Sequence, residues 1–211
     1  MSPIGVFGGT FDPIHYGHLR SAYELLQDLE LGEVRFVPSA APPHRGSTFA
    51  PAELRYRMVE VAVAGQDGFV VDDCEFHRDG PSYTVDTLTA IRAERDAASL
   101  CLIVGMDAYL GLTTWHRWTD ILGLAHIVVA HRPGWQLPNT GALGKLLAEC
   151  GTEDVGELHR QSCGRIYHHA VTQLEIASTE IRELVAAGKD PRFLMPDGVR
   201  DIIVASGCYT N

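Results

Sequence analysis

Two histidines near the start of the chain have the types and spacing needed to act together on an anion. His15 and His18 lie three residues apart within GGTFDPIHYGHL, residues 8–19, where a helix is predicted to begin. Residues at positions i and i+3 share one helix face, so both imidazoles should point the same way. A helix start also offers unpaired backbone N–H groups and a positive dipole end. The segment therefore predicts a polyphosphate site containing both histidines.

Three glycines fit the same interpretation. Gly8 and Gly9 follow an apolar run at residues 4–7 and would let the backbone approach a ligand closely. Gly17 leaves space between the two histidines that a side chain would fill. A strand, a glycine turn and a helix start in succession are how a parallel sheet presents phosphate-binding amides. The segment is neither G-x-G-x-x-G nor a P-loop, because no Gly-Lys-Ser/Thr follows it.

Two plainer interpretations compete with phosphate binding. The segment could be a structural turn with two surface histidines, or half of a metal site. No cysteine or acidic cluster nearby completes a tetrahedral set of ligands, which disfavours the metal. Asp12, followed by Pro13, is typical of a turn. Phosphate binding is therefore the favoured interpretation.

Composition limits the class of protein. A chain of 211 residues fits one domain spanning residues 1–211, with a helical C-terminal portion at about 178–211. A net charge of −10 argues against a general nucleic-acid binder, although a local cationic pocket for a small polyanion is compatible with it. Five cysteines without a C-x-x-C support neither a disulfide framework nor a zinc ribbon. With no signal peptide and no apolar run of 18 residues, we expect a cytoplasmic protein without a membrane span.

Predicted strands and helices alternate along the chain. Strands are expected at residues 4–7, 34–37, 69–71, 100–104, 127–130 and 165–168, and helices at 16–29, 51–64, 83–94, 107–124, 140–150, 178–187 and 197–205. This order predicts an α/β fold, with a doubly wound, mostly parallel sheet and helices on both faces, Rossmann-like in type. Ligands bind such sheets at the carboxyl ends of the strands. Residues 8–18, 42–45, 105–107 and 132–134 each follow a strand, so they should converge there.

Two further segments could bind phosphate. PPHR at residues 42–45 places two cations, His44 and Arg45, on a loop stiffened by prolines, although a plain surface loop is the alternative. IASTEIR at residues 176–182 places Ser178 and Thr179 at a helix start, with Arg182 one turn later. Hydroxyls, open amides and a guanidinium there would make a second phosphate-binding helix end. An ordinary N-cap with a surface arginine would have the same sequence.

An aromatic segment could meet a flat ring. In WHRW, residues 115–118, Trp118 fits core packing together with Ile121 and Leu122. Trp115, which follows two threonines, could instead offer its face to a ligand. SYTVDTL at residues 82–88 mixes hydroxyls with Asp86 at a helix start, which by itself indicates capping.

Seven segments, taken in order along the chain, resemble the motifs of bacterial nicotinate mononucleotide adenylyltransferases. They are GGTFDPIHYGH, PPHR, SYTVDTL, GMD, WHRW, HRPG and IASTEIR. That family belongs to the nucleotidyltransferases with an H-x-G-H signature. The resemblance runs from residue 4 to about residue 182. It implies that the 5′-phosphate of nicotinate mononucleotide attacks the α-phosphate of Mg-ATP, so that pyrophosphate leaves and deamido-NAD forms. It implies no protein nucleophile, Mg²⁺ carried with ATP, and no dedicated metal site on the protein.

The resemblance also implies roles for individual residues. His15 and His18 would be catalytic, with His18 nearest the charge that develops on pyrophosphate. The ATP site would comprise these two and Gly8, Gly9, Thr10, Phe11, Gly105, Asp107, Ser178, Thr179 and Arg182. The nicotinate mononucleotide site would comprise His44, Arg45, Thr84, Trp115, His116 and Arg132. Trp115 would stack on the pyridine ring, and the amides of Thr84 and His116 would face its carboxylate.

The sequence departs from the family pattern at two positions, since Arg45 stands where lysine is usual and Ala177 where serine is usual. Phosphopantetheine adenylyltransferase and an enzyme accepting both nicotinamide and nicotinate mononucleotides are the nearest alternatives. A non-catalytic adenine-nucleotide sensor on the same fold is the alternative from another class. We expect ATP and nicotinate mononucleotide as partners, with neither nucleic acid nor membrane. A homo-oligomer is left open.

Overall fold

A single parallel sheet forms the centre of the protein. The computed structural model describes residues 2–43, 48–132, 138–172 and 174–210. Its strands are β1 (Ile4–Gly9), β2 (Glu33–Pro38), β3 (Phe69–Val71), β4 (Leu100–Gly105), β5 (His126–His131), β6 (Gly151–Thr152) and β7 (Ile166–Ala170). Their order is β3-β2-β1-β4-β5-β7-β6, and every described strand pair is parallel. The predicted α/β fold is confirmed.

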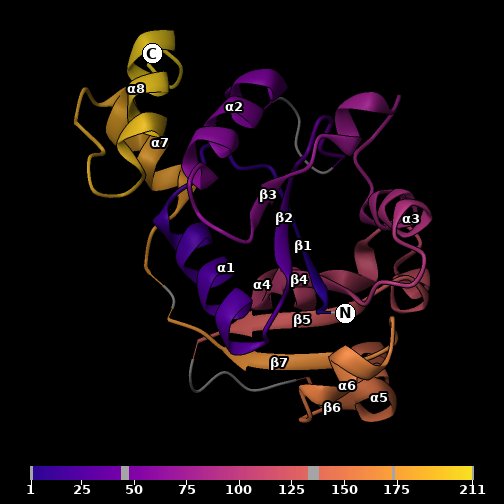
Figure 1. Cartoon of the computed structure of the whole chain (residues 1–211). Helices are drawn as coiled ribbons and strands as arrows, with labels where there is room; N and C mark the ends of the chain where they lie inside the picture. The colour runs from indigo at the N-terminus through magenta and orange to yellow at the C-terminus, as the bar shows by residue number, and fades with distance from the viewer. Residues whose placement is uncertain (1, 44–47, 133–137, 173, 211) are drawn as a thin grey trace.

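Helices cover both faces of this sheet (Figure 1). They are α1 (Tyr16–Asp28), α2 (Ala52–Val63), α3 (Thr84–Glu94), α4 (Met106–Leu110), α5 (Gly141–Cys150), α6 (Gly156–Arg160), α7 (Ser178–Ala186) and α8 (Asp197–Ser206), with short 3-10 turns η1 (Cys74–His77), η2 (Leu112–Thr114) and η3 (Trp118–Gly123). Because β1 and β4 are neighbours, the chain order reverses between them. That reversal opens a crevice at their carboxyl ends, where doubly wound folds bind ligands.

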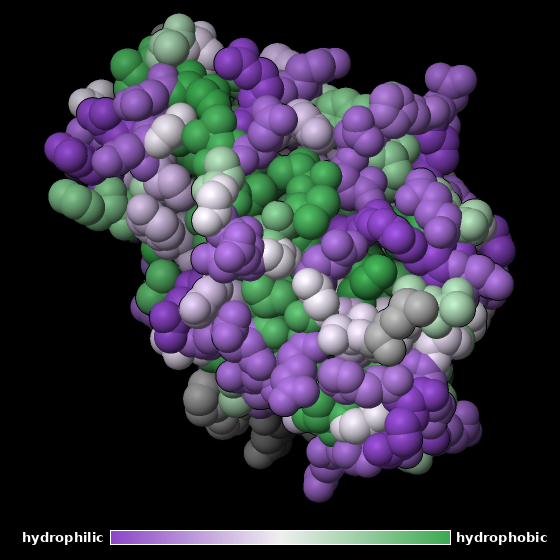
Figure 2. Space-filling model, in the orientation of Figure 1, coloured by the Kyte–Doolittle hydropathy of each residue, from purple (hydrophilic) through white to green (hydrophobic). Residues whose placement is uncertain are grey.

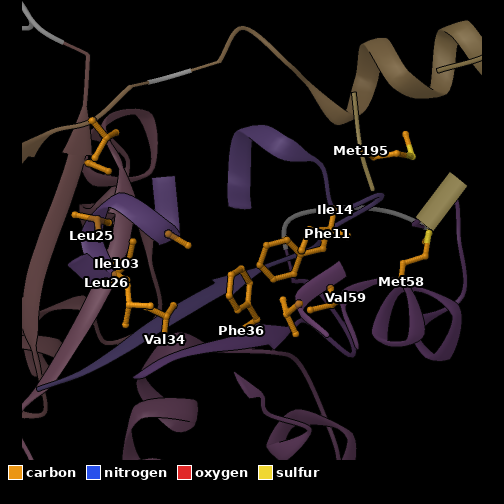
Figure 3. Packing of buried hydrophobic residues seen from close by; sticks show 14 of the residues in the cluster. Phe11, Ile14, Leu25, Leu26, Val34, Phe36, Met58, Val59, Ile103 and Met195 are labelled. Atoms are coloured by element: carbon orange, nitrogen blue, oxygen red, sulfur yellow. The ribbon is translucent and has the colours of Figure 1, made fainter. Parts of the chain in front are cut away.

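The hydrophobic interior consists of two clusters, one on each face of the sheet, because successive side chains of a strand alternate between the faces. Ile103 of β4 belongs to a cluster with α1, α2, α7 and α8, which we call the α1 core. Leu102 and Val104 belong to a cluster with α3, α4 and η3, which we call the α3 core. Successive side chains of a strand point to opposite faces, so one apolar run supplies both cores. Figure 3 shows part of the α1 core, where Phe11 packs among side chains that include Phe36.

The C-terminal helices complete the α1 face. Figure 1 shows α7 and α8 at the upper left, and α8 lies against α2. Most of the face in Figure 2 is hydrophilic, which agrees with an acidic chain that buries its apolar residues in the two cores. Among the described residues, no helix combines the length and the apolar composition that crossing a bilayer requires.

One prediction about local structure was wrong, and two short elements were missed. Residues 107–124 do not form one helix but are divided into α4, η2 and η3. Trp115 is extended, with ψ of 148°, and Arg117 is left-handed, with φ of 50°, so helical hydrogen bonding cannot continue through them. The short elements β6 and α6 were not predicted, because two and five residues carry too little periodicity to be seen.

Candidate active site

Two cavities meet over the carboxyl ends of β1 and β4. The larger, about 640 Å³, contains the two histidines and the start of α7, and we call it the histidine cavity. The smaller, about 370 Å³, lies against the start of α3, and we call it the α3 cavity. Gly8, Gly9 and Trp115 line both. A ligand in one cavity can therefore reach a ligand in the other across these residues.

His15 and His18 lie together in the histidine cavity. Their rings stack with centroids 3.8 Å apart and planes 27° apart. His15 is the N-cap of α1 and has an extended backbone, while His18 is in the first turn of the helix. The backbone N–H of His15 donates to Nδ1 of His18, with the two nitrogens 3.4 Å apart. If Nδ1 accepts this bond, the proton of a neutral His18 lies on Nε2, where it can be donated to a ligand.

Both imidazoles are neutral near pH 7. Burial lowers the pKa of His15 to about 4. Burial, and then the neighbouring His15, lower the pKa of His18 well below its usual value. The histidine cavity therefore presents hydrogen-bond donors rather than two fixed positive charges. An arriving polyanion would favour the charged form of each ring, because a nearby opposite charge raises the pKa of a histidine.

Each glycine of the first segment is required for a different reason. A Cβ on Gly17 would lie 3.0 Å from Cε1 and Nδ1 of His15, so glycine there does make room for the histidine. A Cβ on Gly9 would lie 2.9 Å from the ring of Phe11, so packing within the protein excludes a side chain. A Cβ on Gly8 would meet no atom within 4 Å. Of these three glycines, Gly8 alone leaves space open for a ligand.

Helix starts supply open amides on both sides of the histidine cavity. Among the described residues, no acceptor lies within hydrogen-bond distance of the amide of Gly17 in α1 or of those of Ser178 and Thr179 in α7. Such amides and the positive helix ends are suited to phosphate oxygens. The hydroxyl of Ser178 donates to the carbonyl of Pro13 at 2.9 Å, which ties α7 to the loop before α1.

The other predicted ATP residues are divided between the two cavities. Phe11, Gly105, Asp107, Ser178 and Thr179 line the histidine cavity, and Thr10 lines the α3 cavity.

Arg182 lies behind the histidine cavity rather than on its wall. Its guanidinium donates to the carbonyl of Asp12 at 2.7 Å and to Oγ1 of Thr179 at 3.0 Å, and its Cζ lies 4.3 Å from the ring centre of Phe49. In this conformation the side chain supports the loop that precedes His15. A direct contact between Arg182 and triphosphate stays a prediction.

Arg132 was grouped with the acceptor residues but lines the histidine cavity, beside Ala130. Residues two apart on a strand point to the same side, and Ala130 belongs to the α1 core. Arg132, two residues after Ala130, therefore points to the α1 side of the sheet and away from the α3 cavity. Arg132 forms an ion pair with Glu175 at 2.6 Å.

The α3 cavity brings three predicted acceptor residues together. Thr84, Trp115 and His116 all line it. Thr84 is the first residue of α3, and the described residues offer its amide no hydrogen-bond acceptor. The imidazole of His116 stacks on the ring of Tyr83 with centroids 4.3 Å apart, which fixes the wall beside Trp115.

Pro42 and Pro43 complete this side of the α3 cavity. His44 and Arg45, the two predicted cations of that loop, lie outside the described residues. Trp118, predicted to be a core residue, packs against the α3 core.

Sequence reasoning missed a buried charge cluster beneath the site. Arg55 of α2 is 0% exposed and donates to the carbonyls of Thr10 at 2.6 Å, Ser39 at 2.7 Å and Ala50 at 3.2 Å. One guanidinium thus ties the end of β1 to the end of β2. A signal was present, because Arg55 shares the buried face of its helix with Met58 and Val59.

Asp12 is a second anchor rather than a simple turn residue. It is 2% exposed, and its carboxylate accepts from the amides of Phe49 at 2.8 Å and Ala50 at 3.1 Å. It also accepts from the hydroxyl of Tyr209 at 2.7 Å, which connects the C-terminal tail to the loop before His15. Fixed backbone geometry in that loop preorganises the amides and imidazoles above it.

Comparisons with known proteins agree with this geometry. The cytidylyltransferase-like family matches residues 6–184. Proteins named as nicotinate-nucleotide adenylyltransferases are 47% identical in Aeromonas hydrophila, over 98% of this chain and 97% of the relative, and 48% identical in Methylococcus capsulatus, over 98% and 99%. Nicotinic acid mononucleotide adenylyltransferase of Plasmodium falciparum, solved in complex with NaAD, has the same fold, with a TM-score of 0.73 at 15% identity over 99% of this chain and 98% of that one.

Proposed function

The chain belongs to the nicotinate-nucleotide adenylyltransferases, within the cytidylyltransferase-like family, and we propose that it transfers the adenylyl group of ATP to nicotinate mononucleotide. The products are deamido-NAD and pyrophosphate, and the reaction is a step of NAD biosynthesis. One feature of the geometry supports this proposal most directly. Two cavities of nucleotide-binding character share Gly8, Gly9 and Trp115, so the acceptor phosphate and the α-phosphate of ATP can meet there.

The histidine cavity is the site we assign to ATP. The open amides of α1 and α7 would bind triphosphate oxygens, and His15 and His18 would donate N–H hydrogen bonds to them. Negative charge grows on the leaving pyrophosphate as the bond to the α-phosphate breaks. Donors already held in place stabilise that charge without reorganising, which is the main source of catalysis when no covalent intermediate forms.

The α3 cavity is the site we assign to the acceptor. The indole of Trp115 would stack on the pyridine ring, while the backbone amides of Thr84 and His116 face its carboxylate. Two N–H donors favour an anion over a carboxamide, because charge-assisted hydrogen bonds are roughly twice as strong as neutral ones. Selectivity for the acid therefore follows from the backbone of the site.

We propose that Mg²⁺ enters with ATP. Within the described residues, no group of three histidine, cysteine, aspartate or glutamate side chains is placed to hold a metal ion. Mg²⁺ is commonly bound through substrate phosphates and water, with few protein ligands. Bound in that way, it would neutralise charge on the triphosphate. We also place the reaction in the cytoplasm, because all five cysteines are free thiols and a reducing compartment maintains that state.

The test is an assay of pyrophosphate release and dinucleotide formation with ATP, Mg²⁺ and one acceptor at a time. The acceptors are nicotinate mononucleotide, nicotinamide mononucleotide and phosphopantetheine. We expect kcat/KM for the acid to exceed that for the amide by about 30- to 1,000-fold. Equal use of both would identify a dual-specificity enzyme, transfer to phosphopantetheine would contradict the assignment, and ATP binding without pyrophosphate release would identify a sensor.

A further inference from the structure

Glu75 supplies a buried carboxylate to the wall of the α3 cavity. It lies in η1, is 7% exposed, and lines the cavity together with Ser39 and Thr87. Among the described residues no lysine, arginine or histidine forms a direct ion pair with it, although the buried guanidinium of Arg55 lies close enough for the two charges to attract. Burying a carboxylate without a direct ion pair is costly unless hydrogen bonds compensate. Its presence in a cavity that receives an anionic nucleotide therefore calls for a function.

Two hydrogen bonds hold this carboxylate in place. The hydroxyl of Thr87 donates to Oε1 at 2.6 Å, and the backbone N–H of Ala40 donates to Oε2 at 3.3 Å. These donors come from α3 and from the segment after β2, so Glu75 is fixed from both sides. An ionised carboxylate offers about four lone-pair sites, and these bonds occupy two of them. Each oxygen thus keeps the capacity to accept from a ligand.

The chemical groups of the ligand indicate which of them the Glu75 carboxylate can bind. This step rests on the proposed function, which places nicotinate mononucleotide in the α3 cavity. Its carboxylate and phosphate are anions that a carboxylate repels, and its pyridinium ring is assigned to stacking on Trp115. Its ribose carries two adjacent O–H donors. We infer that Glu75 binds the 2′- and 3′-hydroxyls of the acceptor ribose. Carboxylates play this part for the ribose of dinucleotides in other α/β folds.

The histidine cavity has a matching arrangement. Of its described lining residues, Asp107 alone is acidic, just as Glu75 alone is acidic in the α3 cavity. Two riboses enter the reaction, one with ATP and one with the acceptor, and each cavity presents one carboxylate. The two side chains therefore make natural controls for each other.

The experiment combines a change in the substrate with a change in the protein. We expect the wild-type enzyme to use nicotinate mononucleotide about 10- to 100-fold better in kcat/KM than its 2′,3′-dideoxy analogue. Glu75→Gln should lower kcat/KM for the natural acceptor by a similar factor and reduce that preference at least fivefold. Its preference for ATP over 2′,3′-dideoxy-ATP should be unchanged. Asp107→Asn should show the reverse pattern.

The outcomes separate a sugar contact from structural support. A Glu75→Gln enzyme that loses activity equally on both acceptors, with its preference intact, would overturn the inference and assign Glu75 to holding the cavity wall or to the pyridinium charge. Equal use of the two acceptors by the wild type would overturn it even if the variant did not fold. Absence of any dinucleotide from wild-type enzyme would instead contradict the proposed function on which the inference rests.

Discussion

Gly8 allows the position of the reacting phosphates to be tested without disturbing the fold. It lies in β1 between the two cavities, and a Cβ placed on it would meet no atom within 4 Å. Its φ is not in the left-handed region, so alanine can adopt the same backbone. Gly8→Ala should therefore fold normally. Gly8 shares the strand parity of Val6 in the α3 core, so the methyl group would enter the α3 cavity beside its crossing with the histidine cavity.

Gly8→Ala should raise the free energy of unfolding but lower the activity. Alanine at a compatible glycine position stabilises a protein by about 0.4–1 kcal/mol, because the unfolded chain has fewer conformations. The methyl carbon lies about 1.5 Å from Cα, so a phosphate hydrogen-bonded to the nearby backbone must move by about 1 Å. Displacement of that size costs about 10²-fold in rate. We expect kcat/KM to fall by about that factor for ATP and for the acceptor alike.

The assay measures kcat/KM for each substrate alongside urea unfolding, with two matched variants. Gly123→Ala also meets open space but lies in η3, outside both cavities, so its kinetics should match the wild type. Gly105→Ala meets open space on the histidine cavity only and should raise the KM for ATP more than that for the acceptor. Wild-type kinetics in Gly8→Ala would refute the assignment of this crossing point, and a stability loss above about 2 kcal/mol would show that the space is not open.

Three further predictions concern the loop beneath and around the histidines. His18→Ala should lower kcat by about 10²–10³-fold. Its unfolding midpoint should fall modestly, because the ring packs against His15 and Phe11 and accepts from the amide of His15. Wild-type turnover would exclude His18 from charge stabilisation. Arg55→Met removes a buried cation that serves three carbonyls and should cost about 3–5 kcal/mol in urea unfolding, so a cost below about 1 kcal/mol would contradict its anchoring role. For His15, the folded pKa of about 4 is below the usual value of 6.5, so the unfolded chain binds more protons between those pH values. Stability should therefore be complete above pH 6.5 and fall by about 3 kcal/mol as the pH drops to 4. His15→Gln should show a shallower decline, and the same slope in both proteins would be evidence against this origin.

Much of the fold could be predicted because its signals are local. Apolar runs bounded by turns located β1, β2, β4 and β5, and their alternation with helices required parallel pairing through crossovers. The pairing of His15 with His18 is also local, since three residues at a helix start bring the rings together wherever the helix lies. The resemblance of the motifs in order then identified the family, because short segments near the strand ends carry the chemistry.

The division of the site into two cavities depends on tertiary structure. Which cavity Arg132 lines follows from the parity of its position after β5 and from which helices cover each face, neither of which a linear pattern records. Arg182 turns to the carbonyl of Asp12 because that carbonyl, 170 residues away in sequence, is brought beside α7.

The roles of Arg55 and Glu75 also could not be predicted from the sequence. A charged residue at a helical or turn position is usually solvated, and only the surrounding chain makes it buried. Arg55 becomes an anchor because the ends of β1 and β2 leave carbonyls that need donors. Glu75 becomes part of a cavity wall because α3 and the segment after β2 close around it. The sequence by itself determined which local helices and strands form and which chemical groups they carry. Tertiary structure decided which charged side chains face the ligand and which support the fold, because burial and long-range hydrogen bonding depend on the whole packed chain.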